Sequence, residues 1–125
     1  MKVGIIGAGA LGRALIDALK INEIELFATS RHEGIYKGIK ITKNNAKVLE
    51  ESDIILIAVK PDCVGQVINE IKNIDSQKII ISFAAGIRIR YYESHACQNI
   101  VRAMTNIAIR DHCGTTVFKF GNNLD

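Results

Sequence analysis

Gly7, Gly9 and Gly12 stand near the start of the chain at the spacing G-x-G-x-x-G. A short apolar run at residues 3–6 precedes them, and apolar residues at helical spacing follow them. In such a turn the first glycine permits the bend, the second lets the backbone approach a pyrophosphate, and the third lets a helix pack closely on the strand. The N-terminus of that helix offers unpaired N–H groups to phosphates. The pattern therefore predicts dinucleotide binding, with a fortuitous glycine-rich turn as the alternative.

Ser30 and Arg31 follow the second predicted strand, at residues 24–29. A carboxylate at this position binds the ribose 2′-OH of NAD, whereas an arginine accommodates the 2′-phosphate of NADP. A guanidinium donates charge-assisted hydrogen bonds to phosphate. We therefore expect NADP(H) to be favoured over NAD(H). The competing acid, Glu33, lies further along the loop, and Arg31 has an alternative interpretation as a solvated loop residue.

Two further turns follow apolar strands and are expected to face the cofactor, because ligands of open α/β sheets lie at the carboxyl ends of the strands. Lys60 follows the run at residues 54–59, where it either meets an anionic group or is solvated. Small residues at 84–86 follow the run at 79–83. They either let the backbone approach a flat ring or let a helix pack closely.

Strand and helix patterns alternate along the chain, which predicts an α/β fold with a mainly parallel sheet and helices on both faces, doubly wound as in Rossmann-type domains. No repeat, linker or low-complexity segment suggests an internal boundary. Asn44 or Asn45 is a candidate cap for a short helix. The predicted strands are residues 3–6, 24–29, 39–42, 54–59, 79–83, 100–104 and 115–120, and the later helices are 44–51, 62–74 and 88–95.

The composition of the 125 residues, 48% of them hydrophobic, fits one domain with an aliphatic core. The net charge of +3 comes from scattered Lys and Arg, so no nucleic-acid partner is expected. Cys63, Cys97 and Cys113 form no C-x-x-C pair, which favours reduced thiols in a cytoplasmic protein and no metal site. The longest uncharged apolar stretch, residues 79–87, is too short to span a membrane, and no targeting segment is expected before the first strand.

Several stretches together resemble pyrroline-5-carboxylate reductase. They are residues 3–12, residues 58–61, Ser82 with residues 84–87, residues 101–106, and residues 114–118, in register over nearly the whole chain. The resemblance implies a Rossmann domain over residues 1–121 that binds NAD(P)H. It also implies reduction of a small-molecule substrate, 1-pyrroline-5-carboxylate, to proline, the last step of proline biosynthesis.

Motif and resemblance together give a set of expected binding residues. Asn45 has the alternative role of a helix cap, and Asn106 is the one residue assigned to the substrate side. After Asn106 the family usually continues with Thr-Pro, whereas here a charged loop follows, expected beside the nicotinamide end. The expected cofactor residues are Ile6, Gly7, Ala8, Gly9, Ala10, Leu11, Gly12, Ser30, Arg31, Asn45, Ala58, Val59, Lys60, Pro61, Ala84, Ala85 and Gly86.

The family also has a helical C-terminal domain that dimerises and supplies most of the substrate site. The resemblance therefore implies that residues 122–125 begin a missing region, and that the chain alone is inactive. No residue stands out as a catalytic acid. Two alternatives remain: another NADP reductase with the same N-terminal domain, of the F420-dependent type, and a non-catalytic NADP(H)-binding module. Turnover of NADPH separates an enzyme from a sensor.

Overall fold

The computed structural model describes residues 1–20, 23–72, 77–95, 97, 99–112 and 114–122. They form one eight-stranded sheet whose strand order is β3-β4-β2-β1-β5-β6-β7-β8. The strands are β1 (Lys2–Ile6), β2 (Glu25–Thr29), β3 (Gly34–Tyr36), β4 (Ile39–Thr42), β5 (Ile54–Ile57), β6 (Ile79–Ser82), β7 (Ile100–Met104) and β8 (Val117–Phe120). The helices are α1 (Ala10–Leu19), α2 (Asn45–Glu51), α3 (Val64–Ile71) and α4 (Ile89–Ser94), with 3₁₀ turns η1 (Pro61–Cys63) and η2 (Ile107–Asp111).

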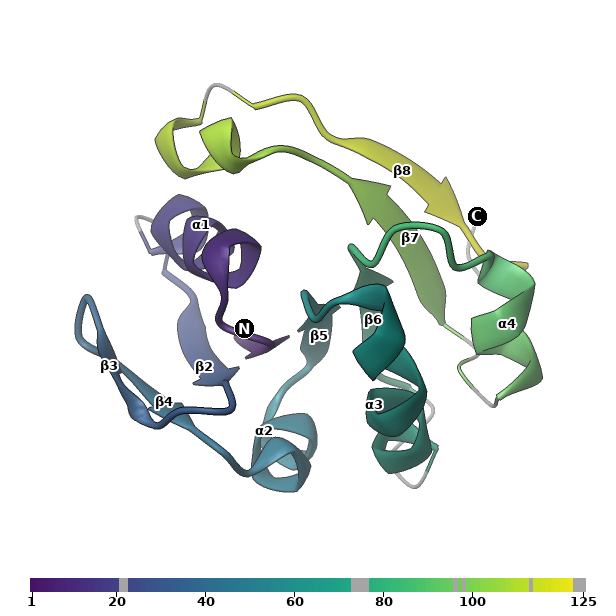
Figure 1. Cartoon of the computed structure of the whole chain (residues 1–125), viewed down its shortest axis with the longest axis horizontal. Helices are drawn as coiled ribbons and strands as arrows, with labels where there is room; N and C mark the ends of the chain where they lie inside the picture. Colours follow the sequence, from purple (N-terminus) through teal and green to yellow (C-terminus); the bar gives the residue numbers. More distant parts are fainter. Residues whose placement is uncertain (21–22, 73–76, 96, 98, 113, 123–125) are drawn as a thin grey trace.

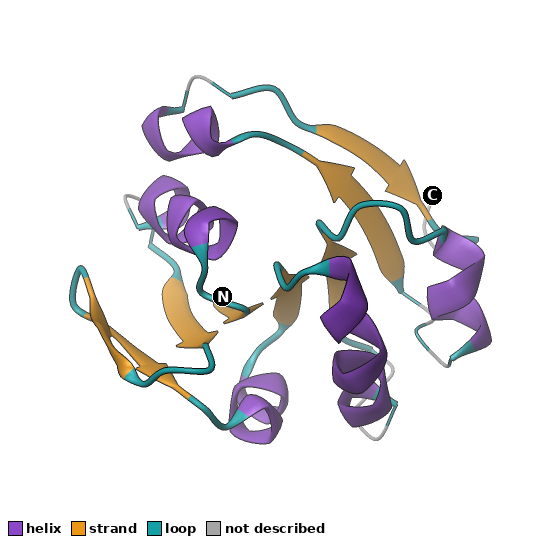
Figure 2. Cartoon of the chain, in the orientation of Figure 1, coloured by secondary structure: helices purple, strands orange, loops and turns teal. Residues whose placement is uncertain are grey.

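The six inner strands are parallel, and the edge strands β3 and β8 each pair antiparallel with a neighbour. Figure 1 shows α1 and η2 over one face of the sheet, and α2, α3 and α4 over the other. Figure 2 shows the same two helical layers by type of element. The predicted doubly wound, Rossmann-type fold is thus confirmed.

Each face of the sheet buries its own apolar core. Successive strand side chains point to opposite faces, so Ile5 packs with Leu15 and Ile16 of α1, whereas Ile6 packs with α2, α3 and α4. This two-sided burial explains why β5 is a continuous apolar run rather than an alternating one.

Several boundaries differ from the prediction. β5 ends at Ile57, two residues early, and β8 begins at Val117 rather than at residue 115. A 3₁₀ turn precedes α3, because Pro61 begins a tight turn there before the regular helix. The predicted end of this helix at residues 73–74 and the segment 123–125 lie outside the described residues. β3 was not predicted, although Lys37 and Gly38, the two residues that join it to β4, have positive φ angles of 48° and 84°, as in a two-residue hairpin turn.

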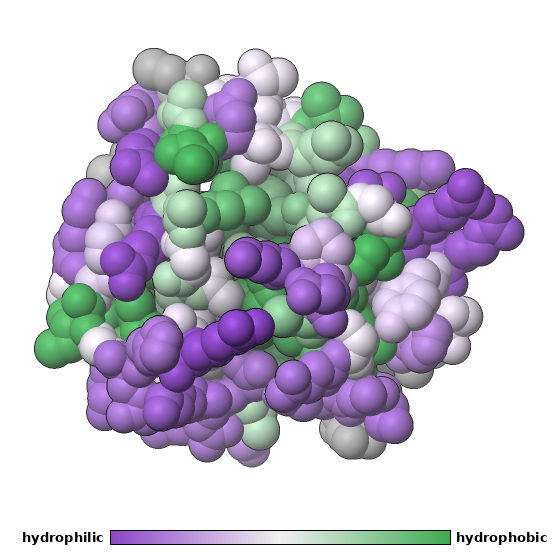
Figure 3. Space-filling model, viewed as in Figure 1, coloured by the Kyte–Doolittle hydropathy of each residue, from purple (hydrophilic) through white to green (hydrophobic). Residues whose placement is uncertain are grey.

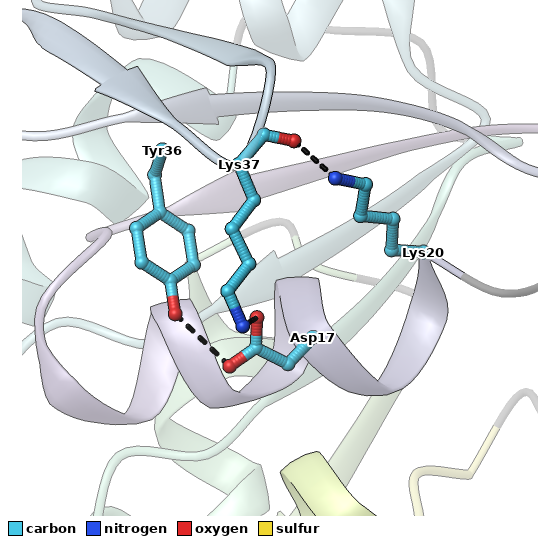
Figure 4. A network of polar contacts seen from close by, with 4 residues as sticks. All are labelled: Asp17, Lys20, Tyr36 and Lys37. Atoms are coloured by element: carbon cyan, nitrogen blue, oxygen red, sulfur yellow. Dashed lines mark hydrogen bonds and ion pairs between the residues drawn. The ribbon is translucent and has the colours of Figure 1, made fainter.

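Asp17 of α1 anchors the β3–β4 hairpin to that helix (Figure 4). Its carboxylate pairs with Lys37 Nζ at 2.8 Å and accepts a hydrogen bond from Tyr36 Oη at 3.0 Å. Lys20 donates to the Lys37 carbonyl. Burial alone would raise the pKa of Asp17, but Lys37, Tyr36 and Arg110 outweigh it and lower that pKa. The network thus joins the end of the hairpin to α1.

The turn η2 was also not predicted. Asn106 begins it by accepting a hydrogen bond from Ala108 N at 3.1 Å, and Ile109 packs into the core under α1. Because η2 contacts α1, the charge of Arg110 lies near enough to Asp17 to help lower the pKa of its carboxyl group.

The edge strand β8 leaves its apolar side chains in solvent: Val117, Phe118 and Phe120 are 64%, 52% and 56% exposed. No helix in the described part of the chain has the length and apolar character that crossing a membrane requires.

Candidate functional site

The glycine turn after β1 has a shape that two of its glycines make possible. Gly7 has φ +100°, a conformation that L side chains rarely adopt, and a Cβ there would lie 2.7 Å from Val59 Cγ1. Gly7 N and Ala8 N both donate to Thr29 O, at 3.1 and 2.7 Å, which joins the turn to the end of β2. A Cβ on Gly12 would overlap the Gly7 carbonyl oxygen. The fold itself therefore requires glycine at positions 7 and 12.

Gly9 is different, because no part of the described protein requires it to be glycine. Its φ is −83°, which any residue adopts, and a Cβ there would meet no atom within 4 Å. The space that this Cβ would enter belongs to a pocket in front of the turn. Neither the backbone conformation nor the packing explains why residue 9 is a glycine. A glycine beside open space at the start of α1 does fit a site where the backbone must approach a phosphate group.

The pocket has a volume of about 540 Å³ and extends from the glycine turn across the ends of β2 and β4 to the first turn of α3. In Figure 3 the molecule is hollowed near its middle, where apolar surface is surrounded by hydrophilic residues. The rim carries Arg31, Lys43 and Lys60, and no Asp or Glu is among the residues that line the pocket. The lining residues are Ile6, Gly7, Ala8, Gly9, Thr29, Ser30, Arg31, His32, Lys43, Asn45, Ala58, Val59, Lys60, Cys63, Gln66 and Val67.

The structure brings most of the predicted cofactor residues to this pocket. From the prediction, the lining includes Ile6, Gly7, Ala8, Gly9, Ser30, Arg31, Asn45, Ala58, Val59 and Lys60. The competing acid Glu33 does not line it. Asn44 caps α2 by accepting a hydrogen bond from Lys47 N at 3.2 Å, so the capping role falls to Asn44 and leaves the Asn45 side chain to the pocket.

Other predicted residues lie elsewhere. Ala10, Leu11 and Gly12 belong to α1 and do not line the pocket, and neither does Asn106, which begins η2. Pro61 and Gly86 line a second, more open cleft of about 790 Å³, together with Arg88 and Arg90. Ala84 is buried in the core and Ala85 is exposed. For Ala84 the small side chain thus serves close packing. The loop with Arg110 does not line the main pocket either.

Six lining residues were missed: Thr29, His32, Lys43, Cys63, Gln66 and Val67. Cys63, Gln66 and Val67 stand at i, i+3 and i+4 at the start of α3, a spacing that places them on one helix face and that the sequence does show. Lys43 follows the predicted strand at residues 39–42, but the strand that lies beside it is set by the pairing of β4 with β2.

Cys63 contacts Arg31 across the pocket. Arg31 Nη2 donates to Cys63 Sγ at 3.2 Å, which draws the guanidinium toward α3. Cys63 and Cys97 are both free thiols. Cys97 is buried, and this burial raises its pKa to about 11. Cys113 lies outside the described residues, and among the described ones no three metal-ligating side chains gather.

The buried pair Ser82 and Tyr92 contributes to packing rather than to the pocket. Their hydroxyl oxygens lie 2.6 Å apart, and both residues are fully buried. Burial raises the pKa of Tyr92, although its hydrogen bond to Ser82 acts in the opposite direction. A neutral, enclosed hydroxyl pair of this kind holds α4 against β6.

A glycine turn at the end of a central strand, beside a pocket lined by cationic residues on a doubly wound sheet, is the arrangement of a dinucleotide-binding domain. Comparison with known families agrees: the family described as "NADP oxidoreductase coenzyme F420-dependent" matches residues 2–86, and the chain belongs to it. Within it, the chain is similar to pyrroline-5-carboxylate reductases. The one from Methanosarcina acetivorans is 38% identical over 120 residues, which are 86% of this chain and 44% of that protein.

Human pyrroline-5-carboxylate reductase 2 is 28% identical over 98% of this chain and 44% of its own length. Among solved structures, Plasmodium falciparum pyrroline carboxylate reductase with NADP bound superposes with a TM-score of 0.91 and 30% identity, over the whole of this chain and 50% of that one. The Coxiella burnetii enzyme gives 0.85 and 25% over 98% of this chain and half of its own. The resemblance found in the sequence is thus confirmed, and the chain spans about half the length of these relatives.

Proposed function

We propose that this chain is the cofactor-binding part of an NADPH-dependent pyrroline-5-carboxylate reductase, which reduces 1-pyrroline-5-carboxylate to proline. The observation that carries the proposal is the pocket itself: it joins an open glycine turn to Arg31 and contains no carboxylate that would bind a free ribose 2′-OH. The printed names of the relatives support the substrate, and the bound NADP of the Plasmodium enzyme supports the cofactor.

In this proposal different residues bind different parts of the cofactor. The backbone at Gly9 and the first N–H groups of α1 bind the pyrophosphate. Ser30 and Arg31 bind the 2′-phosphate through charge-assisted hydrogen bonds. Asn45, which follows β4, and the turn at residues 58–60, which follows β5, contact the nucleotide from other parts of the pocket lining. Pro61, Ala84, Ala85 and Gly86 remain candidates for contact with the nicotinamide. NADPH supplies the hydride, and the protein orients it.

The substrate side is proposed to come mainly from elsewhere. Asn106 caps η2 and does not line the pocket, and the residues that line the pocket include no Asp or Glu. We propose that a further domain, as long as the unmatched half of the relatives, holds the substrate and forms the oligomer contact. The free thiols Cys63 and Cys97 fit a cytoplasmic location, which is also part of the proposal.

The two alternatives differ from the proposal in which compound, if any, the protein would reduce with NADPH. An F420-dependent reductase would share the cofactor domain, and the family match at residues 2–86 lies within that domain. The names of the relatives that match 86–98% of this chain favour pyrroline-5-carboxylate reductase instead. A non-catalytic NADP(H)-binding module would bind the cofactor and oxidise none of it.

The cofactor proposal can be tested by thiol protection. Cys63 lines the pocket and is partly exposed, whereas Cys97 is buried and serves as an internal control. Iodoacetamide labelling followed by peptide mass spectrometry should show Cys63 modified in the free chain and protected by saturating NADPH. Equal labelling of Cys63 with and without NADPH would contradict the assignment of this pocket.

The activity can be tested with a chimera in which residues 1–121 precede the C-terminal part of the Methanosarcina acetivorans relative. We expect oxidation of NADPH that depends on 1-pyrroline-5-carboxylate. A chimera that binds NADPH but leaves this imine unreduced would contradict the substrate while keeping the cofactor assignment. Reduction of F420 instead would favour the other reductase.

A further inference from the structure

Lys43 reaches the pocket because the sheet places β4 next to β2. Thr29 and Thr42 are register partners at the ends of these parallel strands, and Ser30 N donates to Thr42 O at 2.9 Å. Neighbouring strands lie about 4.8 Å apart. The residues that leave the two strand ends, Ser30–Arg31 and Lys43, therefore emerge side by side on one edge of the sheet.

The backbone of Lys43 is held on both sides. The bond from Ser30 to Thr42 fixes the residue before it, and Asn44, the residue after it, is the cap of α2. The hairpin that carries β4 is in turn anchored to α1 by the pair of Asp17 and Lys37. The Lys43 side chain thus lines the pocket from a fixed origin rather than from a free loop.

The charge of Lys43 has no protein partner among the residues that the structure describes. Other lysines of the chain do have partners: Lys37 pairs with Asp17, and Lys78 donates to the carbonyls of Leu49, Glu50 and Ser52. Arg31 is only weakly engaged, by one contact to the Cys63 sulfur. Both cations are thus available to an anion in the pocket.

The position of Lys43 along the sheet indicates which anionic group of the cofactor it would bind. β1 carries the pyrophosphate turn, and β2 and then β4 lie on one side of it, whereas β5 with Lys60 lies on the other. A dinucleotide lies across the strand ends with its adenosine ribose at the end of β2. A phosphate monoester carries between about −1.5 and −2 charges at pH 7, so one arginine leaves it partly uncompensated.

We propose that Lys43 is a second specificity residue of this pocket: with Arg31 it binds the 2′-phosphate that distinguishes NADP(H) from NAD(H). This inference rests on the proposed cofactor function. Arg31 provides the planar, two-bond contact, and Lys43 a compact charge on the opposite side of the phosphate. The specificity for NADPH then depends on the packing of two strands and not on the loop after β2 alone.

The test compares Lys43→Met with Lys47→Met by titrating each variant with NADPH and with NADH, following nicotinamide fluorescence. Lys47 lies on α2, carries the same charge and does not line the pocket, so it controls for loss of net charge. Lys43→Met should lower the affinity for NADPH about fivefold and leave the affinity for NADH unchanged, as expected for the loss of one partly solvated ion pair. Lys47→Met should change neither, and Lys43→Arg should keep most of the affinity for NADPH.

The other possible results contradict either the role of Lys43 or the proposed cofactor. Suppose that the wild-type chain prefers NADPH. If Lys43→Met then loses affinity for NADPH and NADH equally, or loses none, the role of Lys43 is overturned and the proposed cofactor is kept. A wild-type chain that binds NADH as well as NADPH, or binds neither, would overturn the proposed cofactor and this inference together. Circular dichroism of each variant confirms that the sheet is folded.

Discussion

Replacing Gly9 and replacing Gly12 should damage the protein in opposite ways. A Cβ at Gly9 meets no atom within 4 Å, and its φ of −83° suits any residue. Gly9→Val should therefore leave the fold in place. The change loses a good capping residue but also reduces the freedom of the unfolded chain, and each effect is about 0.5–1 kcal/mol. The midpoint of thermal unfolding should then move by no more than about 4 °C.

Binding should respond far more strongly, because the valine side chain enters the space in front of the turn. If the pyrophosphate loses two charge-assisted hydrogen bonds of about 1.5–3 kcal/mol each, affinity falls at least about 100-fold. Gly12→Ala is the matched control. Its Cβ would overlap the Gly7 carbonyl oxygen and lie 3.0 Å from the Gly7 carbonyl carbon, so backbone must move. Such overpacking costs about 1–3 kcal/mol of stability.

The assay is a thermal melt and an NADPH titration of both variants and the wild type. Gly9→Val should melt like the wild type and not bind, and Gly12→Ala should melt earlier. If Gly9→Val folds and binds NADPH normally, the pyrophosphate does not lie on this turn. If Gly9→Val unfolds, glycine is needed there for the fold itself, and the argument from open space is refuted.

Three further predictions concern the other parts of the molecule. Arg31→Ala should weaken NADPH about tenfold or more and leave NADH nearly unchanged in the same titration, since it removes a bidentate contact to the 2′-phosphate; equal losses would remove that role. The 125-residue chain at high concentration should bind NADPH yet oxidise little of it with 1-pyrroline-5-carboxylate, because hydride transfer needs the imine carbon held about 3–3.5 Å from the nicotinamide; turnover like that of a longer relative would show a complete site here. Asp17→Asn should lower the melting temperature at pH 7, and the gap to the wild type should close as the pH falls below the ordinary value of 3.8, because a lowered pKa gives stability that is lost on protonation in the folded state; a gap unchanged from pH 7 to pH 3 would show that the charge of Asp17 does not stabilise the hairpin.

The parts of the site that depend on local sequence could be predicted. The glycine turn and Arg31 each follow directly from a strand and a motif, and the structure brings them to one pocket. Lys43 could not be found in this way, because only the pairing of β2 with β4 brings it beside Ser30. The residues at the start of α3 that line the pocket could have been predicted, since Cys63, which caps the helix, and Gln66 are spaced as neighbours on a helix face.

The fold could be predicted in its middle and less well at its edges. Strands buried on both faces, such as β5, are marked by continuous apolar runs. β3 has no such run: it pairs with β4 through the turn at Lys37 and Gly38, and Tyr36 and Lys37 contact Asp17 on α1. Small residues at 84–86 were ambiguous for a physical reason: Ala84 packs in the core, and no local pattern separates core packing from contact with a ligand.

The edge strand β8 has a practical consequence for work with this chain in solution. Its outer backbone groups face no further strand of the sheet, and Val117, Phe118 and Phe120 give that edge an apolar character interrupted only by Lys119. Edges of this kind invite pairing with a second chain. We therefore expect reversible self-association that grows with protein concentration. Adding charge at Val117 should delay precipitation during purification and leave nucleotide binding unchanged, because no residue of β8 lines the pocket.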